Sequence, residues 1–292
     1  MINFLKYRYV GFIFSVLFLF VGFTAYFIKG GFLYNIDFAG GAEVRISFEK
    51  KLEISKLRQT LSSKGWKKVV IQSLGRSGKE FMLKINTEDP DLEEKFKADI
   101  FSDIVDNKMT VENMDWVGAA VGKDMKRNAF MAVLLSLLII LLYISIRSKY
   151  AYAVGAVVAI IHDILFVLVF LLLFNEPISL AVLAVLLAIL GYSLNDTIVI
   201  FSRIRENIVK MNGISLMTIV NTSLNQTFKR TIRTTVSTLL AVGSFYVFGG
   251  ETLRGFAFAM LVGTIVGTYS SIYIASPVML AITSLINKPK TN

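Results

Sequence analysis

The feature that most constrains this chain is a series of long apolar segments. A helix needs about 20 predominantly apolar residues to cross the hydrocarbon core of a bilayer. Six segments meet or nearly meet that requirement, at about 10–28, 129–146, 151–174, 178–201, 234–248 and 256–286. The fifth is short unless it begins earlier, near Phe228, and the sixth is longer than one straight crossing needs. The sequence therefore predicts a polytopic α-helical membrane protein with six transmembrane helices.

Composition supports this class and excludes several others. The chain is 54% hydrophobic and 18% charged, and soluble domains carry about 25% charged residues. We read the formal net charge of +10 as basic membrane-flanking loops, not as nucleic-acid binding. Cysteine is absent and there is one histidine, which excludes disulfides, thiolate metal sites and a multi-histidine metal site. We expect no cofactor, no metal and no enzymatic activity.

The distribution of lysine and arginine predicts the orientation. Basic residues precede the first span, follow the sixth, and lie in the connections between spans two and three and between spans four and five. The alternate short connections carry only one basic residue, Arg254. Basic residues favour the cytoplasmic side, so both termini are predicted to be cytoplasmic. The first span has no clear cleavage site after it and is interpreted as an uncleaved anchor.

The segment outside the membrane has the pattern of a small α+β domain. Strands are predicted at about 43–48, 69–73, 80–85 and 109–114, with helices at 53–64 and 90–106. The order β-α-β-β-α-β is that of a ferredoxin-like domain. The predicted organisation is a tail and first helix (1–29), an extracytoplasmic domain with linkers (30–128), five further helices (129–286) and a cytoplasmic tail (287–292).

Three ionisable residues lie within apolar spans, namely His162, Asp163 and Asp196. A carboxylate in the middle of a membrane helix costs about 2.5–3.5 kcal/mol on insertion scales, and such residues mark ion pathways by default. Tyr192 and Asn195 lie on the same predicted helix side as Asp196 and offer it hydroxyl and amide neighbours. Two such carboxylates on adjacent helices suggest a proton relay.

The polar residues also have a second interpretation, in which they only hold helices together. For Asp163 this structural role is as plausible as a relay role, since His162 and Asp163 can form a local pair. Arg230 and Arg233, at the start of the fifth span, are each candidates to pair with Asp196, although positive-inside logic alone accounts for both. The residue pattern does not choose between them.

Several motifs together resemble a known family. "NIDFAGG" follows the first span, "VGAAVGKDM" precedes the second and "IHDI" lies in the third. "GYSLNDTIVIFSRIREN" covers the end of the fourth span, and "NQTFKRTIRTTVSTLL" leads into the fifth. In this order they resemble the SecF family, the smaller membrane subunits of the bacterial SecD–SecF accessory complex of the Sec protein translocase. One departure is Asn35, where the family motif usually has glycine.

The resemblance implies a resistance–nodulation–division type fold in the bacterial cytoplasmic (inner) membrane. It implies a SecD-like membrane partner, the Sec channel and unfolded preproteins as clients, and use of the proton-motive force in export. It also implies that Asp196 responds to protons with Arg230 beside it, that Asp163 has a related role, and that Asp37, Gly40 and Gly41 form a family motif.

Two other functions stay open at this point: half of a small-molecule efflux transporter of similar fold, and a scaffold protein that transports nothing. The residues also leave open whether the coupling ion is H⁺ or Na⁺, whether the SecD-like partner is a separate chain, and whether Arg230 or Arg233 faces Asp196.

Overall fold

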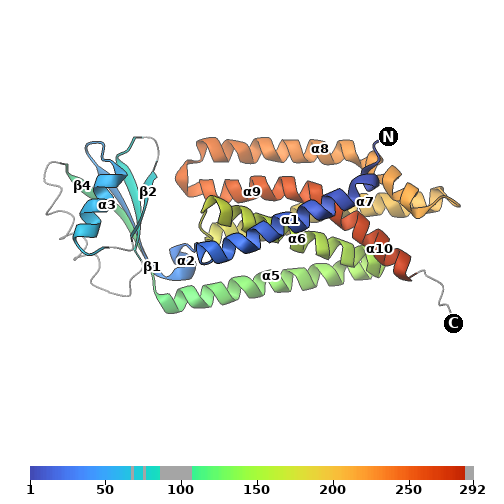
Figure 1. Cartoon of the computed structure of the whole chain (residues 1–292), viewed down its shortest axis with the longest axis horizontal. Helices are drawn as coiled ribbons and strands as arrows, with labels where there is room; N and C mark the ends of the chain where they lie inside the picture. Colours follow the sequence, from blue (N-terminus) through green and yellow to red (C-terminus); the bar gives the residue numbers. More distant parts are fainter. Residues whose placement is uncertain (67–68, 75–76, 86–106, 287–292) are drawn as a thin grey trace.

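The chain forms a bundle of long helices with a small β-sheet at one end (Figure 1). The computed structural model describes residues 1–66, 69–74, 77–85 and 107–286. The N-terminus and the end of α10 (Ser276–Ile286) lie at the opposite end of the bundle from the sheet. The sheet is inserted in the chain between the first long helix and the second.

Within the described residues, five helical stretches are long and apolar enough to cross a membrane. They correspond to α1 (Arg8–Lys29), α5 (Ala119–Arg147), α6 (Tyr150–Phe174), α7 (Leu180–Lys210), and α9 (Gly250–Ser270) joined to α10. These correspond to the first four predicted spans and the sixth. The structure therefore supports a polytopic helical membrane protein.

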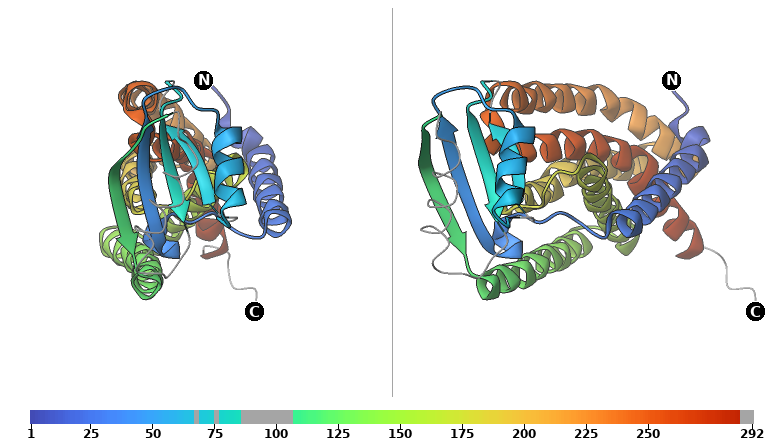
Figure 2. Two further views of the ribbon diagram at one scale, coloured as in Figure 1. Left: turned by 90° about the vertical axis from the view of Figure 1, so that its left-hand side faces the viewer. Right: turned by 60° about the vertical axis from the view of Figure 1, so that its left-hand side comes forward.

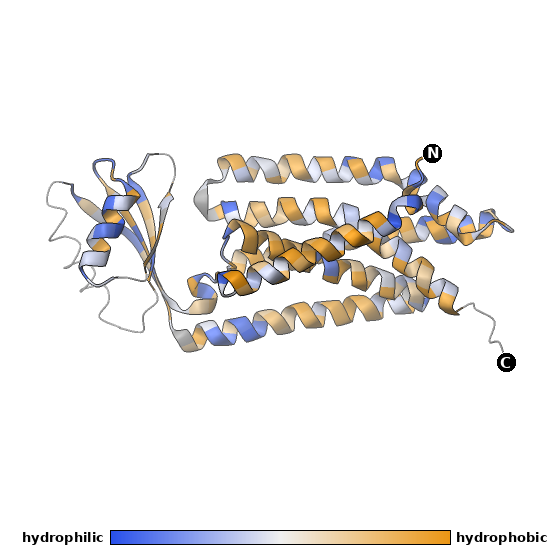
Figure 3. Cartoon of the chain, in the orientation of Figure 1, coloured by the Kyte–Doolittle hydropathy of each residue, from blue (hydrophilic) through white to orange (hydrophobic). Residues whose placement is uncertain are grey.

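Helix α8 (Leu216–Phe248) corresponds to the fifth predicted span and is not among those five. It is 33 residues long, but Lys229, Arg230 and Arg233 interrupt its apolar sequence. It packs along α7 and α9, and its hydrophilic part lies toward the end of the bundle away from the sheet (Figure 3). A sixth crossing therefore stays a prediction.

The last long helix contains a π-helical turn. Ser271–Ala275 (η2) joins α9 to α10 with no non-helical residue between them, and α10 runs at an angle to α9 (Figure 1). The Ser271 hydroxyl donates to the Gly267 carbonyl, and the Ser276 hydroxyl donates to the Ser271 carbonyl. Side-chain donors thus engage backbone carbonyls where the regular helical pattern changes. Single π turns inside α-helices often lie at functional sites.

Glycines of α9 allow it to approach α7 closely. A Cβ atom on Gly263 would lie 2.1 Å from the Cδ1 of Ile189, and one on Gly267 would lie 3.1 Å from the Cβ of Ser193. The GxxxG pattern of α9 therefore packs against a neighbouring helix of the same bundle. Small residues permit such contacts between membrane helices, where no hydrophobic effect drives association.

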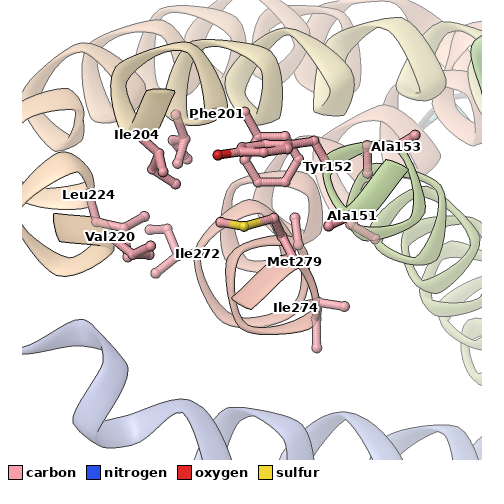
Figure 4. Close-up of a cluster of buried hydrophobic side chains, with 14 of the residues drawn as sticks. Ala151, Tyr152, Ala153, Phe201, Ile204, Val220, Leu224, Ile272, Ile274 and Met279 are labelled. Carbon is pink, nitrogen blue, oxygen red and sulfur yellow. The ribbon is translucent and has the colours of Figure 1, made fainter. Parts of the chain in front are cut away.

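A large apolar cluster holds the helices together at the end away from the sheet. Side chains from α6, α7, α8, η2 and α10 meet in it (Figure 4). The 3-10 helix η1 (Phe4–Tyr7) adds the buried Phe4 and Leu5, and the Phe4 ring lies 5.1 Å from that of Phe228. The N-terminal residues therefore pack into the bundle just before α1.

The sheet has four antiparallel strands in the order β2-β3-β1-β4. They are β1 (Gly41–Phe48), β2 (Val69–Leu74), β3 (Glu80–Ile85) and β4 (Met109–Val117). Viewed from its own end of the molecule, the sheet lies in front of the helices (Figure 2). All four predicted strands are confirmed, and β4 extends three residues beyond the predicted end at 114.

One face of the sheet carries the domain core. Val44, Ile46 and Phe48 alternate along β1 as buried residues, and α3 (Ile54–Ser63) contributes Leu57 and Leu61 to the same cluster. The alternation is that of a strand with one buried face. The second predicted helix, at 90–106, lies outside the described residues, so the ferredoxin-like assignment stays a prediction.

Candidate functional site

The two intramembrane carboxyl groups lie on neighbouring helices near the middle of the bundle. Asp163 is in α6 and Asp196 is in α7, and Asn175, in left-handed conformation, ends α6 before a short connection to α7. Ser193, one turn before Asp196, donates to the Asp163 carboxylate at 2.6 Å. The structure thus joins the helix that carries Asp196 to the Asp163 carboxylate through Ser193.

Asp163 is fully buried, and three side chains contact its carboxyl group. The hydroxyls of Ser193 and Ser270 donate to Oδ2 at 2.6 and 2.9 Å. Nδ1 of His162 lies 3.0 Å from Oδ1. Because Ser193 is on α7 and Ser270 is on α9, this one carboxyl group joins three helices. Burial of such a group is tolerated when its lone pairs are satisfied in this way.

His162 extends the same network to α1. Its Nε2 lies 3.0 Å from Ser15 Oγ, which is 2.9 Å from the hydroxyl of Tyr269. That hydroxyl donates to the Gly11 carbonyl at 2.6 Å. The sequence prediction of a local His162–Asp163 pair is matched by the geometry, and the structure adds a polar connection across α1, α6, α7 and α9.

Asp196 has a different environment. Its side chain is 4% exposed, yet Oδ2 has no hydrogen-bond partner in the described structure. The buried Tyr192 hydroxyl, one turn earlier, also lacks one, and Asn195 is exposed. The expected amide and hydroxyl partners therefore do not bind Asp196 here. A buried polar atom without a partner costs about 1–3 kcal/mol, so Asp196 differs from Asp163 in lacking a protein donor at this oxygen.

Arg230 is the basic residue whose charge acts on Asp196. Both Arg230 and Arg233 are exposed on α8, and no ion pair within 4.0 Å joins either to Asp196 in the described part of the chain. The arrangement favours Arg230 over Arg233 as the arginine near this carboxyl group. The Arg230 and Asp196 side chains are thus close enough to interact electrostatically, but they do not form an ion pair.

Hydroxyl pairs line the contacts around α9 and η2. Thr197 of α7 lies 2.9 Å from Ser271 between their side-chain oxygens, and Thr235 of α8 lies 2.7 Å from Thr268. Thr264, fully buried on α9, has no partner for its hydroxyl within the described structure. Buried hydroxyl groups thus join α9 and η2 to α7 and α8.

The predicted family motif lies where the sheet meets the bundle. Asp37, in α2 (Ile36–Ala39), accepts a hydrogen bond from the backbone N–H of Leu180 at 3.0 Å, at the first residue of α7. Asn35 N–H donates to the Ile178 carbonyl at 2.9 Å, and Ile178 N–H donates to the Leu33 carbonyl at 2.8 Å. A carboxylate is favourable at the positive end of a helix dipole. The linker is therefore docked on the start of the helix that carries Asp196.

Gly40 and Gly41 lie between this linker and the sheet. Their φ angles are 76° and 118°, in the region that favours glycine. Gly122 of α5 packs against the same turn, and a Cβ on it would lie 2.9 Å from the Gly40 nitrogen. The motifs before and after the outer domain thus meet each other through glycine backbone.

Sequence reasoning missed Ser15 and Tyr269 as members of the Asp163 network. Both lie in strongly apolar or aromatic surroundings, and their roles depend on which helices become neighbours. A weak signal was available, because Gly11 and Ser15 form a small-xxx-small face on α1. In the described residues, no group of three His, Cys, Asp or Glu side chains is placed to hold a metal ion.

Comparison with known proteins gives a consistent result. Residues 97–285 match the family model described as "Protein export membrane protein SecD/SecF, C-terminal". The chain is 37% identical over 279 residues to the protein translocase subunit SecF of Pseudomonas aeruginosa, covering 96% of this chain and 90% of that protein. It is 39% identical to the SecF subunit of Calditerrivibrio nitroreducens, covering 97% of this chain and 95% of that one.

The fold also matches a solved structure. A crystal structure of SecDF, a translocon-associated membrane protein from Thermus thermophilus, superposes with a TM-score of 0.86 at 35% identity. The alignment covers 97% of this chain and 39% of the SecDF chain. A structure of SecDF in a super-membrane-facing form aligns with a TM-score of 0.71.

Proposed function

Because this chain belongs to the SecD/SecF family of protein-export membrane proteins, we propose that it is a Sec translocase accessory subunit that uses the proton-motive force. One observation supports the proposal that proton movement is coupled to export. Oδ2 of Asp196 is buried without a hydrogen-bond partner in the described structure, and the charge of Arg230 acts on this carboxyl group. A carboxyl group so placed changes its interactions strongly when it gains or loses a proton. Each charge that crosses 100 mV supplies about 2.3 kcal/mol, which is ample for breaking one such interaction.

The proposed mechanism begins with protonation of Asp196. The neutral acid no longer attracts Arg230, whereas the carboxylate does, so proton binding and release alternate the attraction between α7 and α8. A shift of α7 reaches the outer domain through the Asp37–Leu180 hydrogen bond and the docked linker. The sheet then moves with the linker and acts on an exported chain.

Asp163 is proposed as a further member of the relay, with His162, Tyr192, Asn195 and Arg233 in supporting roles. Asp163 is connected to the Asp196 helix through Ser193. Exposed Asn195 is available to a partner subunit or to water. A carboxyl group with hydroxyl neighbours can bind either H⁺ or Na⁺. The coupling ion must therefore be identified by imposing pH and sodium gradients separately.

The proposed topology has both termini in the cytoplasm and residues 30–128 outside, in the bacterial inner membrane. In this arrangement the tail and first helix occupy 1–29, helices two to six occupy 129–286 and a cytoplasmic tail occupies 287–292. Helix α8 is then the fifth of the six crossings along the chain. The chain's own basic loops support this orientation.

A SecD-like chain is the proposed partner within the membrane. The related SecDF protein of Thermus thermophilus carries a SecF-like region within a longer chain, of which this chain aligns with 34%. Large apolar side chains on α1 and α5 are exposed, including Phe20 at 65% and Phe130 at 68%. Lipid and a partner bundle together would cover these faces. The Sec channel and unfolded preproteins are the proposed further partners.

The test is export driven by a proton gradient in vesicles that contain the complete complex. Asp196→Asn keeps the shape of the side chain but cannot ionise, and we expect it to abolish both ion flux and gradient-stimulated export. Asp124→Asn, an exposed residue outside the bundle core, is the matched control and should retain both. Imposed pH and sodium gradients identify the ion. Full activity of Asp196→Asn would refute the proposal.

A further inference from the structure

A continuous series of polar contacts joins the backbone of α1 to the carboxyl group of Asp163. Its members are the Gly11 carbonyl, the Tyr269 hydroxyl, the Ser15 hydroxyl, the two ring nitrogens of His162 and Asp163 Oδ1. The successive separations are 2.6, 2.9, 3.0 and 3.0 Å. Each contact is a hydrogen bond only if one proton lies between its two atoms, so the series constrains where the protons are.

The assignment begins at Gly11, because a carbonyl oxygen only accepts. Tyr269 has a single hydroxyl proton and donates it to Gly11. The contact between Ser15 and Tyr269 then requires the Ser15 proton. With that proton committed, Ser15 accepts from His162, so Nε2 of the ring must carry hydrogen. The protein environment therefore selects a ring protonated on Nε2.

The remaining contact is between Nδ1 of His162 and Oδ1 of Asp163. The other carboxyl oxygen, Oδ2, already accepts from Ser193 and Ser270. A neutral ring with its proton on Nε2 presents a lone pair at Nδ1, and an ionised carboxylate presents another at Oδ1. Two acceptors would then face each other at 3.0 Å in a buried site. One more proton is needed to make this contact favourable.

We infer that His162 and Asp163 together hold one shared proton between Nδ1 and Oδ1, and form a proton-binding site separate from Asp196. The proton gives either an imidazolium with a carboxylate or a neutral imidazole with a carboxylic acid. Both states have zero net charge. A neutral ring beside an ionised Asp163 would instead bury one net negative charge, which a membrane interior disfavours.

Other titratable groups near the pair are few. Tyr269 contacts the His162 ring, Tyr273 packs on Tyr269, and Tyr192 and Asp196 lie on α7 within one turn of Ser193. The sequence has no titratable side chain at 10–25 in α1, at 128–142 in α5 or at 276–286 in α10. Asp196 is therefore the carboxyl group that competes with the pair for protons in this layer. Ionisation of one site disfavours ionisation of the other.

The single histidine makes the inference directly testable. Protein labelled with ¹⁵N-histidine gives a nitrogen spectrum of His162 alone, recorded in lipid bilayers at neutral pH. The shifts distinguish the two neutral tautomers from imidazolium. We expect hydrogen on Nε2, either in a neutral ring or in imidazolium. A neutral ring with hydrogen on Nδ1 and a bare Nε2 would overturn the inference.

An infrared comparison with Asp163→Asn completes the proton count. If the ring is neutral, wild type should show a carboxylic-acid carbonyl band that the variant lacks, and if the ring is imidazolium this band should be absent. A neutral ring together with an ionised Asp163 would overturn the shared proton. In Asp163→Asn the amide can donate to Nδ1, so the ring should become neutral with hydrogen on Nε2. These readouts do not depend on export, so they are separate from the test of the proposed function.

Discussion

Removal of the Asp37 carboxylate should loosen the start of α7. In Asp37→Ala the Leu180 N–H loses the acceptor that lies 3.0 Å away. Loss of a side-chain acceptor at a helix start costs about 1 kcal/mol, which corresponds to an approximately fivefold larger population of the open amide. Hydrogen exchange of a peptide covering residues 178–185, measured by mass spectrometry in lipid nanodiscs, should therefore become about fivefold faster.

Two further variants isolate the cause. Asp37→Asn keeps an acceptor oxygen and loses the charge, so it should lose only the helix-dipole contribution of about 0.3–1 kcal/mol. Asp124→Ala removes an exposed carboxylate that lies 3.8 Å from Arg127 in a surface pair, and should not change exchange at 178–185. Equal exchange in wild type and Asp37→Ala would refute the claim that this contact holds the linker to α7.

Three other changes give independent checks. Gly263→Ala places a methyl group against Ile189 and should lower the unfolding temperature by overpacking, at a cost of about 1–3 kcal/mol, whereas Ile189→Ala in the same chain should restore part of the loss. Burial raises the pKa of Glu43 above its ordinary value of 4.5, so the folded sheet binds the proton more tightly than the unfolded chain. The stability of the folded sheet should therefore fall as pH rises from about 4.5 through the raised pKa. Hydrogen exchange of β1 should show this pH dependence in the wild type and lose it in Glu43→Gln. Asn225→Ala removes two hydrogen bonds to the backbone of Ile2, at 2.8 and 2.7 Å, and should speed exchange at residues 2–7 without affecting the sheet.

The sequence predicted the elements well because apolar periodicity determines them. Unbroken apolar runs located α1, α5, α6 and α7, and alternation located β1 with Val44 and Ile46 on its buried face. Helix α8 is harder to predict as a span, because the exposed Lys229, Arg230 and Arg233 interrupt its apolar sequence. Composition along one segment cannot decide whether such basic residues lie at the membrane edge or within the span.

The sequence identified the ionisable residues of the candidate site, but it did not predict their hydrogen-bond partners. Their positions within apolar spans, and the free-energy cost of a carboxylate in a membrane, identified Asp163 and Asp196 correctly as buried groups. Helical spacing suggested that polar neighbours would serve Asp196, but Ser193 donates to Asp163 on the next helix. Spacing within one helix cannot decide this, because a side chain at the α6–α7 contact has partners on both sides.

The contrast between the two aspartates argues for different roles. Asp163 is bound by donors from two other helices, and its proton is shared with a ring that is itself fixed by Ser15. Such a group can hold a proton without large movement, because every partner is already in place. Asp196 is also buried, but its Oδ2 has no partner in the described structure, and Arg230 acts on it electrostatically from α8 without an ion pair. A change of charge at Asp196 alters the electrostatic force between α7 and α8. The same change at Asp163 is compensated by the hydrogen bonds that already surround its carboxyl group. Under the proposed function, we therefore assign mechanical work to the Asp196 site and proton holding or transfer to the His162–Asp163 pair.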